Sequence, residues 1–344
     1  MQDPVHFHGF ASGAIRPIHP QRMSETCFLD FSSWEAQILS ASDEKKNLPF
    51  AWVTIAVMAT IFDLHTHSTA SDGTSSPKEL IQHAAEQGVD AIALTDHDTT
   101  EGLAEAAATA QSLGIGFIPG VEISASWNSH VVHIVGLGIS PDCTLLQDGL
   151  ATLRQFRNWR AEEMGRRLAK VGISDAFEGA RALSSGVLIG RCHFARFLVK
   201  HGHAESEKKV FQRFLTHGKP GYVPGKWAEL EDAVAWILAA GGQAVIAHPA
   251  RYPFTRTKLR RLLAEFAEAG GVGLEVVSGS HNRDETSTMA RHAQDFALLA
   301  STGSDYHGPE NPWRRLGRFQ ALPEICTPIW HDWGLPLTTR AISA

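Results

Sequence analysis

The sequence predicts an α/β fold in which a parallel sheet closes into a barrel and carries an inserted helical cap. Short apolar segments alternate with amphipathic helical segments from residue 59 onward, as in proteins with parallel sheets. The number of alternations favours a barrel over an open sheet. Helical segments from about 145 to 227 interrupt this pattern. The 344 residues, 43% of them hydrophobic, can form one barrel and an added element.

The first strand and helix of the predicted barrel follow from local patterns. Residues 59–65 (ATIFDLH) form a short apolar run and predict a buried strand. The segment SPKEL follows, in which Ser76 suits the N-cap of a helix and Pro77 its first position. Glu79 completes a capping box ahead of apolar residues at helical spacing.

Three more strands and one helix complete the first half of the barrel. Residues 90–98 (DAIALTDHD) predict an apolar strand with a polar end. The helix after it ends at Gly114. Its apolar positions are Leu103, Ala107, Ala110 and Leu113. Residues 115–126 and 130–139 predict two further strands.

The cap and the second half of the barrel follow the same reasoning. In the cap, one helix is predicted from Ala151 to Lys170, with shorter helices near His193–His201 and Glu205–Thr216. Alternation then resumes, and helices are expected at 230–242, 257–271 and 283–296, with strands at 243–249, 272–277 and 297–307.

These patterns divide the chain into four parts. The barrel is expected from 58–144 and 228–325, the cap from 145–227, and a C-terminal tail from 326–344. Residues 1–57 show no helical or strand periodicity and predict a poorly ordered extension, so Met58 is a candidate natural start. The extension lacks the basic start and cleavage site of a signal peptide.

Composition limits the cellular setting and the partners. No run of eighteen apolar residues predicts a membrane span. The four cysteines are scattered without CxxC spacing, which argues against a disulfide framework and favours a cytoplasmic protein. No obligate protein partner is evident.

Residues 145–227 carry fifteen Lys and Arg against seven Asp and Glu, whereas the whole chain has a charge of −6. A basic segment of this kind favours a phosphate-bearing partner, although a solvated helical face is equally compatible.

Metal-ligand side chains occur where the predicted strands end. Each is a histidine or carboxylate, and in a barrel the carboxyl ends of the strands meet on one face. Taken singly, HxH is a weak signal, a His before Pro suits a turn, and Asp305 could cap a helix. Repetition at successive strands favours a metal site instead. The nine residues are His65, His67, Asp72, His97, Glu122, His133, His248, Asp305 and His307.

Nine donors are more than one ion needs, because a catalytic zinc takes about three protein ligands. Two or three divalent ions are therefore expected, with Glu122 as a bridging carboxylate. Mixed imidazole and carboxylate ligands suit Mn²⁺, Fe²⁺ or Zn²⁺ better than Mg²⁺ or Ca²⁺, which prefer oxygen alone. Asp96 and Asp98 flank His97 and could orient ligands or simply form a turn.

At these residues the sequence resembles the PHP (polymerase and histidinol phosphatase) family of metal-dependent phosphoesterases. The resemblance runs in order through FDLHTHSTASDG, ALTDHDT, PGVEIS, AHP and GSDYH, over about residues 60–319. It implies a distorted seven-stranded β/α barrel that holds up to three metals, with manganese the foremost candidate. The family's ligand positions fall on the nine residues given above.

Within the family the chain resembles a branch whose helical insertion carries GRPHxARxLV. Here the segment reads GRCHFARFLV, which retains Arg191 and His193 and has Cys192 in place of proline. KPGYVP, with Lys219 and Tyr222, also fits. The branch implies nucleotide substrates: removal of the 3′-phosphate from nucleoside 3′,5′-bisphosphates, or trimming of short RNA from a 5′-phosphorylated end.

The expected mechanism is in-line attack of a metal-bound hydroxide on phosphorus. Asp72, His97 and His307 are the expected catalytic residues, at the ion nearest the departing oxygen. Arg191 and His193 are expected to bind a substrate phosphate, and Lys219 and Tyr222 are further candidates. A second set of residues could extend this site: a basic path at Arg154, Arg157, Arg160 and Arg167, and base stacking on Trp159, Phe194, Tyr222 or Trp227.

Three other functions are compatible with parts of the sequence. A histidinol phosphatase belongs to the same family, but the cap favours nucleotides. A metal-dependent amidohydrolase also begins with HxH, yet it normally bridges its ions with a lysine, where this chain has Glu122. A metal-free module that binds through a basic cap would have lost ligands, and none is missing.

Overall fold

The computed structural model describes residues 60–184 and 188–334. The expected N-terminal extension and Met58 lie outside the described residues, as does the end of the expected C-terminal tail. No helix in the described ranges combines the length and apolar character that crossing a membrane requires.

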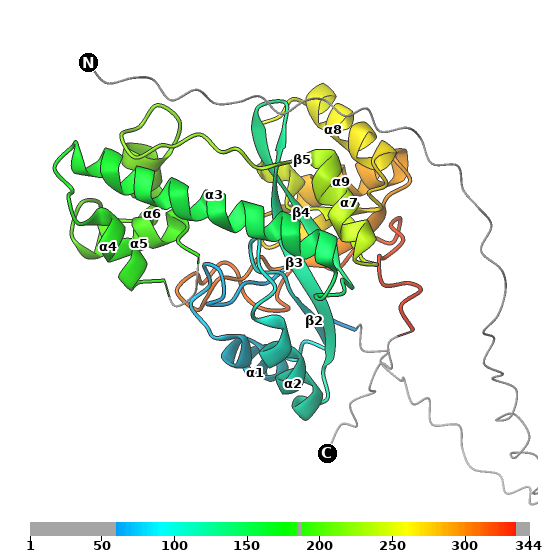
Figure 1. The fold of residues 1–344 in the computed structure, drawn as a ribbon. Helices are drawn as coiled ribbons and strands as arrows, with labels where there is room; N and C mark the ends of the chain where they lie inside the picture. The colour runs from blue at the N-terminus through cyan, green and yellow to red at the C-terminus, as the bar shows by residue number, and fades with distance from the viewer. Residues whose placement is uncertain (1–59, 185–187, 335–344) are drawn as a thin grey trace, which may run out of the picture. The chain divides into compact units, whose positions relative to one another are not determined.

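Seven strands form a nearly closed barrel, as the sequence predicted (Figure 1). In spatial order they are β1 (Phe62–Asp63), β2 (Ala91–Leu94), β3 (Gly116–Trp127), β4 (His130–Leu137), β6 (Gln243–Ile246), β7 (Gly273–Ser278) and β8 (Leu299–Gly303). A two-residue strand, β5 (Ala228–Glu229), pairs with the outer part of β3. The barrel returns on itself where Leu64 N donates to Thr302 O at 3.0 Å. Gly303 lies so close to β1 that a Cβ there would meet the Cβ of His65 at 2.3 Å.

One strand runs against the others, which corrects the expectation of a wholly parallel sheet. β4 is antiparallel to both β3 and β6, while the remaining pairs of the barrel are parallel. The connection from β3 to β4 is only Asn128 and Ser129, both with positive φ (45° and 63°). A two-residue turn of this kind makes a hairpin, because a parallel pair needs a long crossover. The barrel therefore departs from a wholly parallel arrangement because no helix connects β3 to β4.

Five helices cover the barrel: α1 (Pro77–Glu86), α2 (Leu103–Leu113), α7 (Leu230–Ala239), α8 (Arg256–Glu268) and α9 (Arg283–Asp295). Their apolar faces pack on the strands in one core that includes Ile81, Ile237 and Phe266. The expected face of α2 is partly wrong. Ala106 is buried in place of Ala107, and Leu113 is 47% exposed because it lies at the end of the helix.

In its described residues, the interruption contains four helices and a single π-helical turn. They are α3 (Thr144–Ala169), α4 (Ala176–Ala182), α5 (Arg191–Lys200), α6 (Glu207–Val210) and the π turn Phe211–Leu215. α3 is longer than predicted, and Figure 1 shows it running from the barrel to the other cap helices. Leu146 and Leu150, near its start, belong to the barrel core. Met164 and Leu168, near its end, pack in a separate core with Phe194. This helix therefore joins the two cores.

The capping box of α1 closes the loop that carries Asp72. Ser76 Oγ accepts from Glu79 N at 3.2 Å, and Glu79 Oε2 accepts from Ser76 N at 2.8 Å. We expect Ser76→Ala to lower the free energy of unfolding by about 1 kcal/mol, because Glu79 N at the start of the helix loses its hydrogen-bond acceptor. Chemical denaturation measures this change. Ser112→Ala, at an exposed serine of α2, is the control, and an equal loss there would contradict the assignment.

Candidate metal centre

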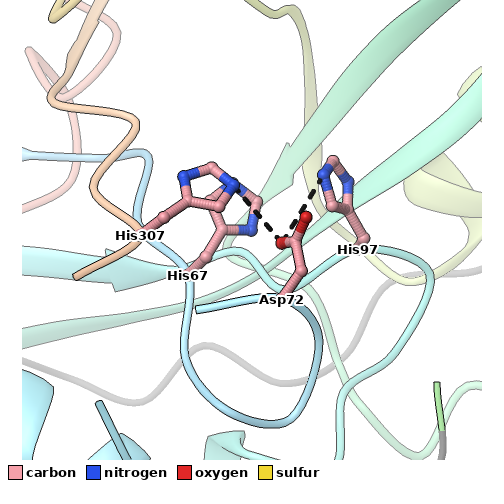
Figure 2. A group of neighbouring side chains, drawn as sticks. All are labelled: His67, Asp72, His97 and His307. Carbon is pink, nitrogen blue, oxygen red and sulfur yellow. Dashed lines mark ion pairs between the residues drawn. The ribbon is translucent and has the colours of Figure 1, made fainter. Parts of the chain in front are cut away.

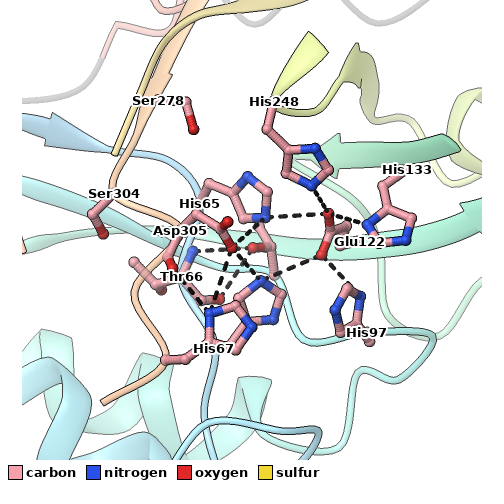
Figure 3. Close-up of polar contacts among 12 residues, drawn as sticks. His65, Thr66, His67, His97, Glu122, His133, His248, Ser278, Ser304 and Asp305 are labelled. Atoms are coloured by element: carbon pink, nitrogen blue, oxygen red, sulfur yellow. Dashed lines mark hydrogen bonds and ion pairs between the residues drawn. The ribbon is translucent and has the colours of Figure 1, made fainter. Parts of the chain in front are cut away.

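The barrel brings the nine predicted donors to one face. His65 and His67 follow β1, His97 follows β2, and Glu122 lies within β3. The others come from the hairpin strand, from the loops after β6 and β8, and from the loop before α1: His133, His248, Asp305, His307 and Asp72. His133 lies in the first half of β4 yet reaches this face because β4 is antiparallel, which places it opposite Ser124 of β3. Figure 3 shows all of these side chains except Asp72 and His307 converging, and Figure 2 shows those two beside His67 and His97.

Four residues form the largest group of donors (Figure 2): His67, Asp72, His97 and His307. One ligand atom from each lies within 4.8 Å of the others. Asp72 Oδ1 is 3.3 Å from His307 Nε2 and 3.9 Å from His97 Nε2. The side chains of His97 and His307 are 13% and 21% exposed, whereas His67 is fully buried. This group therefore faces the solvent side of the cluster.

Glu122 belongs to two of the three remaining groups (Figure 3). Its Oε1 lies 2.8 Å from His133 Nδ1, 3.1 Å from His248 Nε2 and 3.4 Å from His65 Nε2. Its Oε2 lies 2.8 Å from His97 Nδ1 and 3.3 Å from His67 Nε2. A third group joins His65, His67 and Asp305. Because each oxygen of Glu122 faces a different set of imidazoles, the carboxylate has the geometry of a bridge.

The donor set fits divalent cations. Several of its buried atoms make no aligned hydrogen bond among the described residues, although some lie at ion-pair distance from one another: His65 Nε2, both ring nitrogens of His67, Asp72 Oδ1, His97 Nδ1 and Glu122 Oε2. A buried polar atom without a partner costs about 1–3 kcal/mol, so concentrating them at one point is unfavourable unless something binds there. Imidazole nitrogens and carboxylate oxygens together are ligands of transition-metal ions.

Burial and mutual charge set the protonation of these groups. Burial raises the pKa of Glu122, but His97, His133 and His65 outweigh it and hold that pKa well below its usual range. Burial lowers the pKa of His67 to about 3 and that of His133 to about 4. Both imidazoles are therefore neutral near pH 7 and retain the lone pair that a metal ligand needs.

Glu275 on β7 supports the cluster and was not predicted. Its Oε2 lies 3.1 Å from His65 Nδ1 and accepts from His248 N at 2.5 Å. The carboxylate is 2% exposed and orients the ring of His65 from behind. Its signal in the sequence is a lone acid within the apolar strand GLEVV, where burial would otherwise be costly.

Asp96 and Asp98 lie outside the cation groups but hold the chain around them. Asp96 accepts from Ser68 N at 2.8 Å and from Ser71 Oγ at 2.5 Å, which fixes the loop between His67 and Asp72. Asp98 accepts from Ser124 N at 2.7 Å and pairs with Arg157 at 2.5 Å. Both carboxylates therefore fix backbone and neighbouring side chains.

A cleft of about 1070 Å³ opens from the donors between the barrel and the cap. Arginines line much of it: Arg157, Arg160, Arg191, Arg196, Arg251 and Arg314. Of the helical-spacing arginines in the sequence, Arg157 and Arg160 line the cleft, which rules out a purely solvated face. Arg251 and Arg314 pair with Asp305 Oδ2 at 2.7 and 2.8 Å. Arg196, Arg251 and Arg314 were not predicted, because only the fold brings them here.

The four predicted substrate-binding residues are placed differently from one another. Arg191 lines the cleft together with its neighbour Cys192. His193 is 2% exposed, and its Nδ1 accepts from Gly190 N at 3.0 Å, so it caps the start of α5. Lys219 is exposed, and neither it nor Tyr222 is among the residues that line the cleft.

The barrel and its donor groups define the class of the protein: an α/β-barrel hydrolase with the side chains to hold several metal ions. Residues 63–247 match the PHP domain. The chain belongs to the PHP family and is a phosphoesterase of that family.

Two relatives and one solved structure are similar to this chain over most of its described residues. A 3′,5′-nucleoside bisphosphate phosphatase of Chromobacterium violaceum is 51% identical over 78% of this chain and 95% of its own length. The 5′-3′ exoribonuclease Rnm of Escherichia coli is 44% identical over 82% of this chain and 96% of its own. The structure of an amidohydrolase from C. violaceum with bound sulfate and no metal has a TM-score of 0.77 at 50% identity, over 79% and 95% of the two chains.

Metal binding should stabilise the folded protein. After treatment with a chelator, addition of Mn²⁺ at about 100 times its Kd should raise the free energy of unfolding by about 2.7 kcal/mol. Thermal unfolding measures this as a rise of several degrees in Tm. Mg²⁺ is the control and should act more weakly, because it prefers oxygen ligands. No shift with Mn²⁺, Fe²⁺ or Zn²⁺ would contradict a metal centre.

Removing the charge of Glu275 should weaken metal binding without leaving a cavity in the core, because glutamine has nearly the same volume as glutamate. We expect Glu275→Gln to lower metal affinity by about 10- to 100-fold, because the ring of His65 loses its ionic partner. Competition with a chromophoric chelator measures the affinity. Glu105→Gln, at an exposed position of α2, is the matched control and should leave it unchanged. Equal affinities in the two variants would show that Glu275 does not orient His65.

Proposed function

We propose that this PHP phosphoesterase removes the 3′-phosphate of nucleoside 3′,5′-bisphosphates. One observation carries the proposal: the same cleft contains the candidate metal ligands at its bottom and, on the side of the cap, arginines that pair with no carboxylate of the described residues. A substrate with two phosphates meets both features, one phosphate at the donors and the other at the arginines. The 51% identity to a 3′,5′-nucleoside bisphosphate phosphatase supports the same substrate class.

The nine donors are proposed to hold two or three ions, of manganese, iron or zinc. Such ions would lower the pKa of a water molecule and neutralise the phosphoryl oxygens. Asp72, His97 and His307 are proposed to be the catalytic residues, because they belong to one group of donors and all three line the cleft. Glu275 and Asp96 hold this arrangement by orienting His65 and the loop that carries Asp72.

Arg160 and Arg191 are proposed to bind the phosphate that does not react. Among the described residues neither makes an ion pair with a carboxylate. Arg160 is 7% exposed, its Nε donates to Val223 O at 3.2 Å, and burial together with Arg191 and Arg157 lowers its pKa to about 9. Burial also lowers the pKa of Arg191. Buried cations without a counter-ion provide a favourable position for an anion.

The cap, residues 145–227, is thus proposed as the element that recognises substrate. His193 would contribute indirectly, because it caps the helix on which Arg191 is the first residue. The positions of Lys219 and Tyr222 give no support to a direct role.

A second candidate is 5′-3′ cleavage of short 5′-phosphorylated RNA. The cleft extends past the donors to Arg196, Lys208 and Ser206, which leaves room for a chain longer than one nucleotide. The 44% identity to the exoribonuclease Rnm points the same way. Both activities would place a terminal phosphate at the same arginines, so the two substrates share one recognition step.

A substrate panel tests the proposal. With manganese present, phosphate release should be fastest from a nucleoside 3′,5′-bisphosphate, slower from a nucleoside 3′-monophosphate, and absent from histidinol phosphate. A 5′-phosphorylated oligoribonucleotide, followed by release of mononucleotides, tests the second candidate. Greater activity on histidinol phosphate than on the bisphosphate would overturn the nucleotide assignment.

His67→Ala should abolish turnover of every substrate while the circular dichroism spectrum is retained.

Arg191→Ala should raise KM for the bisphosphate by about 10- to 100-fold, because a charge-assisted hydrogen bond is worth about 1.5–3 kcal/mol. KM for the nucleoside 3′-monophosphate should change little, since that substrate lacks the second phosphate. Arg166→Ala is the control: Arg166 lies on α3, 62% exposed, and pairs with Glu163. A rise in KM of the same size on both substrates would remove Arg191 from recognition of the second phosphate.

A further inference from the structure

Three aromatic side chains, apart from histidines, line the cleft: Phe211, Trp227 and Trp313. The aromatic candidates that the sequence offered are placed otherwise. Phe194 is fully buried, and neither Trp159 nor Tyr222 lines the cleft. A flat aromatic surface near a phosphate site is what a nucleobase stacks on.

Two of the three rings already have a cation against them. Trp227 is 7% exposed, with the guanidinium carbons of Arg157 and Arg160 at 5.0 and 5.4 Å from its ring centroid. The guanidinium of Arg191 lies 5.8 Å from the centroid of Phe211. These rings therefore help to hold the arginines and have little free surface for a base.

Trp313 is different. It is 86% exposed, the most exposed large apolar side chain in the described ranges, and within them its ring makes no aromatic or cation–π contact. Burying an indole contributes strongly to stability, so leaving this one in solvent forgoes a large gain. Its exposed ring also borders the cleft that contains the cation donors.

The backbone holds Trp313 at a defined place beside these donors. Trp313 N donates to Asn311 Oδ1 at 3.2 Å, which fixes the turn ahead of it. The next residue, Arg314, pairs with Asp305 Oδ2 at 2.8 Å and donates to Asp305 O at 3.3 Å. Trp313 is therefore next in the chain to a residue whose guanidinium contacts a proposed metal ligand, and Trp313, Arg314 and that ligand all line the same cleft.

We propose that Trp313 is the stacking platform for the base of the substrate nucleotide. This inference rests on the proposed function and extends it, because it adds a base subsite to the two phosphate subsites. Stacking requires only a π face, so the platform should accept purines and pyrimidines and give purines the greater benefit through their larger rings.

The test compares 2′-deoxyadenosine 3′,5′-bisphosphate with its base-free analogue, 1,2-dideoxyribose 3,5-bisphosphate. Trp313→Ala should raise KM for the adenine substrate about tenfold and leave kcat, metal content and KM for the base-free analogue unchanged. Trp313→Phe should restore most of the loss, because it keeps an aromatic face. Ile325→Ala, which removes an exposed apolar side chain outside the cleft, should have no effect.

An equal rise in KM on both compounds, or no rise on either, would overturn the platform. A loss of metal in Trp313→Ala would do the same, because it would show that the residue acts through Arg314 and Asp305. If the unaltered enzyme hydrolyses neither compound, the proposed function fails. Calorimetric titration with the same pair then decides separately whether the base adds affinity that depends on Trp313.

Discussion

The structure depends on one buried carboxylate, Glu122, surrounded by five imidazoles from four other segments of the chain. Each of its oxygens lies within 3.4 Å of at least two histidine nitrogens. A carboxylate without exposure to water is costly unless positive charge or cations lie around it. The strands, the hairpin and the loops have to bring those groups together, and the barrel is the arrangement that does so. Stability and chemistry thus share the same constraint.

Closure of the barrel is what makes the cluster possible. His65 and Asp305 are 240 residues apart, and they meet because β8 returns to β1 with Gly303 packed against the backbone of His65. The antiparallel β4 serves the same end by a different route, since reversing its direction carries His133 to the face that the parallel strands reach with their carboxyl ends. A local departure from the regular fold therefore completes the set of donors.

Charge divides the cleft into regions with separate tasks. Donor atoms that make no hydrogen bond among the described residues lie at the bottom of the cleft, and arginines of the cap and of the barrel surround them. Arg251 and Arg314 neutralise Asp305, and Arg157 neutralises Asp98. Arg160 and Arg191 have no such partner among the described residues, so their charge remains for a ligand. This difference separates arginines that are paired with a carboxylate of the site from arginines that are not.

The sequence by itself determined the alternation of strands and helices, the capping box of α1 and the nine candidate donors that the barrel brings together, because these depend on local spacing and on polar residues at the ends of apolar runs. It did not reveal the direction of β4, the early start of α3, or the roles of Glu275, Arg251, Arg314 and Trp313. Those depend on which segments become neighbours, and an isolated acid, arginine or tryptophan carries no periodic signal. Only the tertiary structure decides which charges are paired, which rings are free, and which donors share a cation, since each is a property of contacts between residues far apart in the chain.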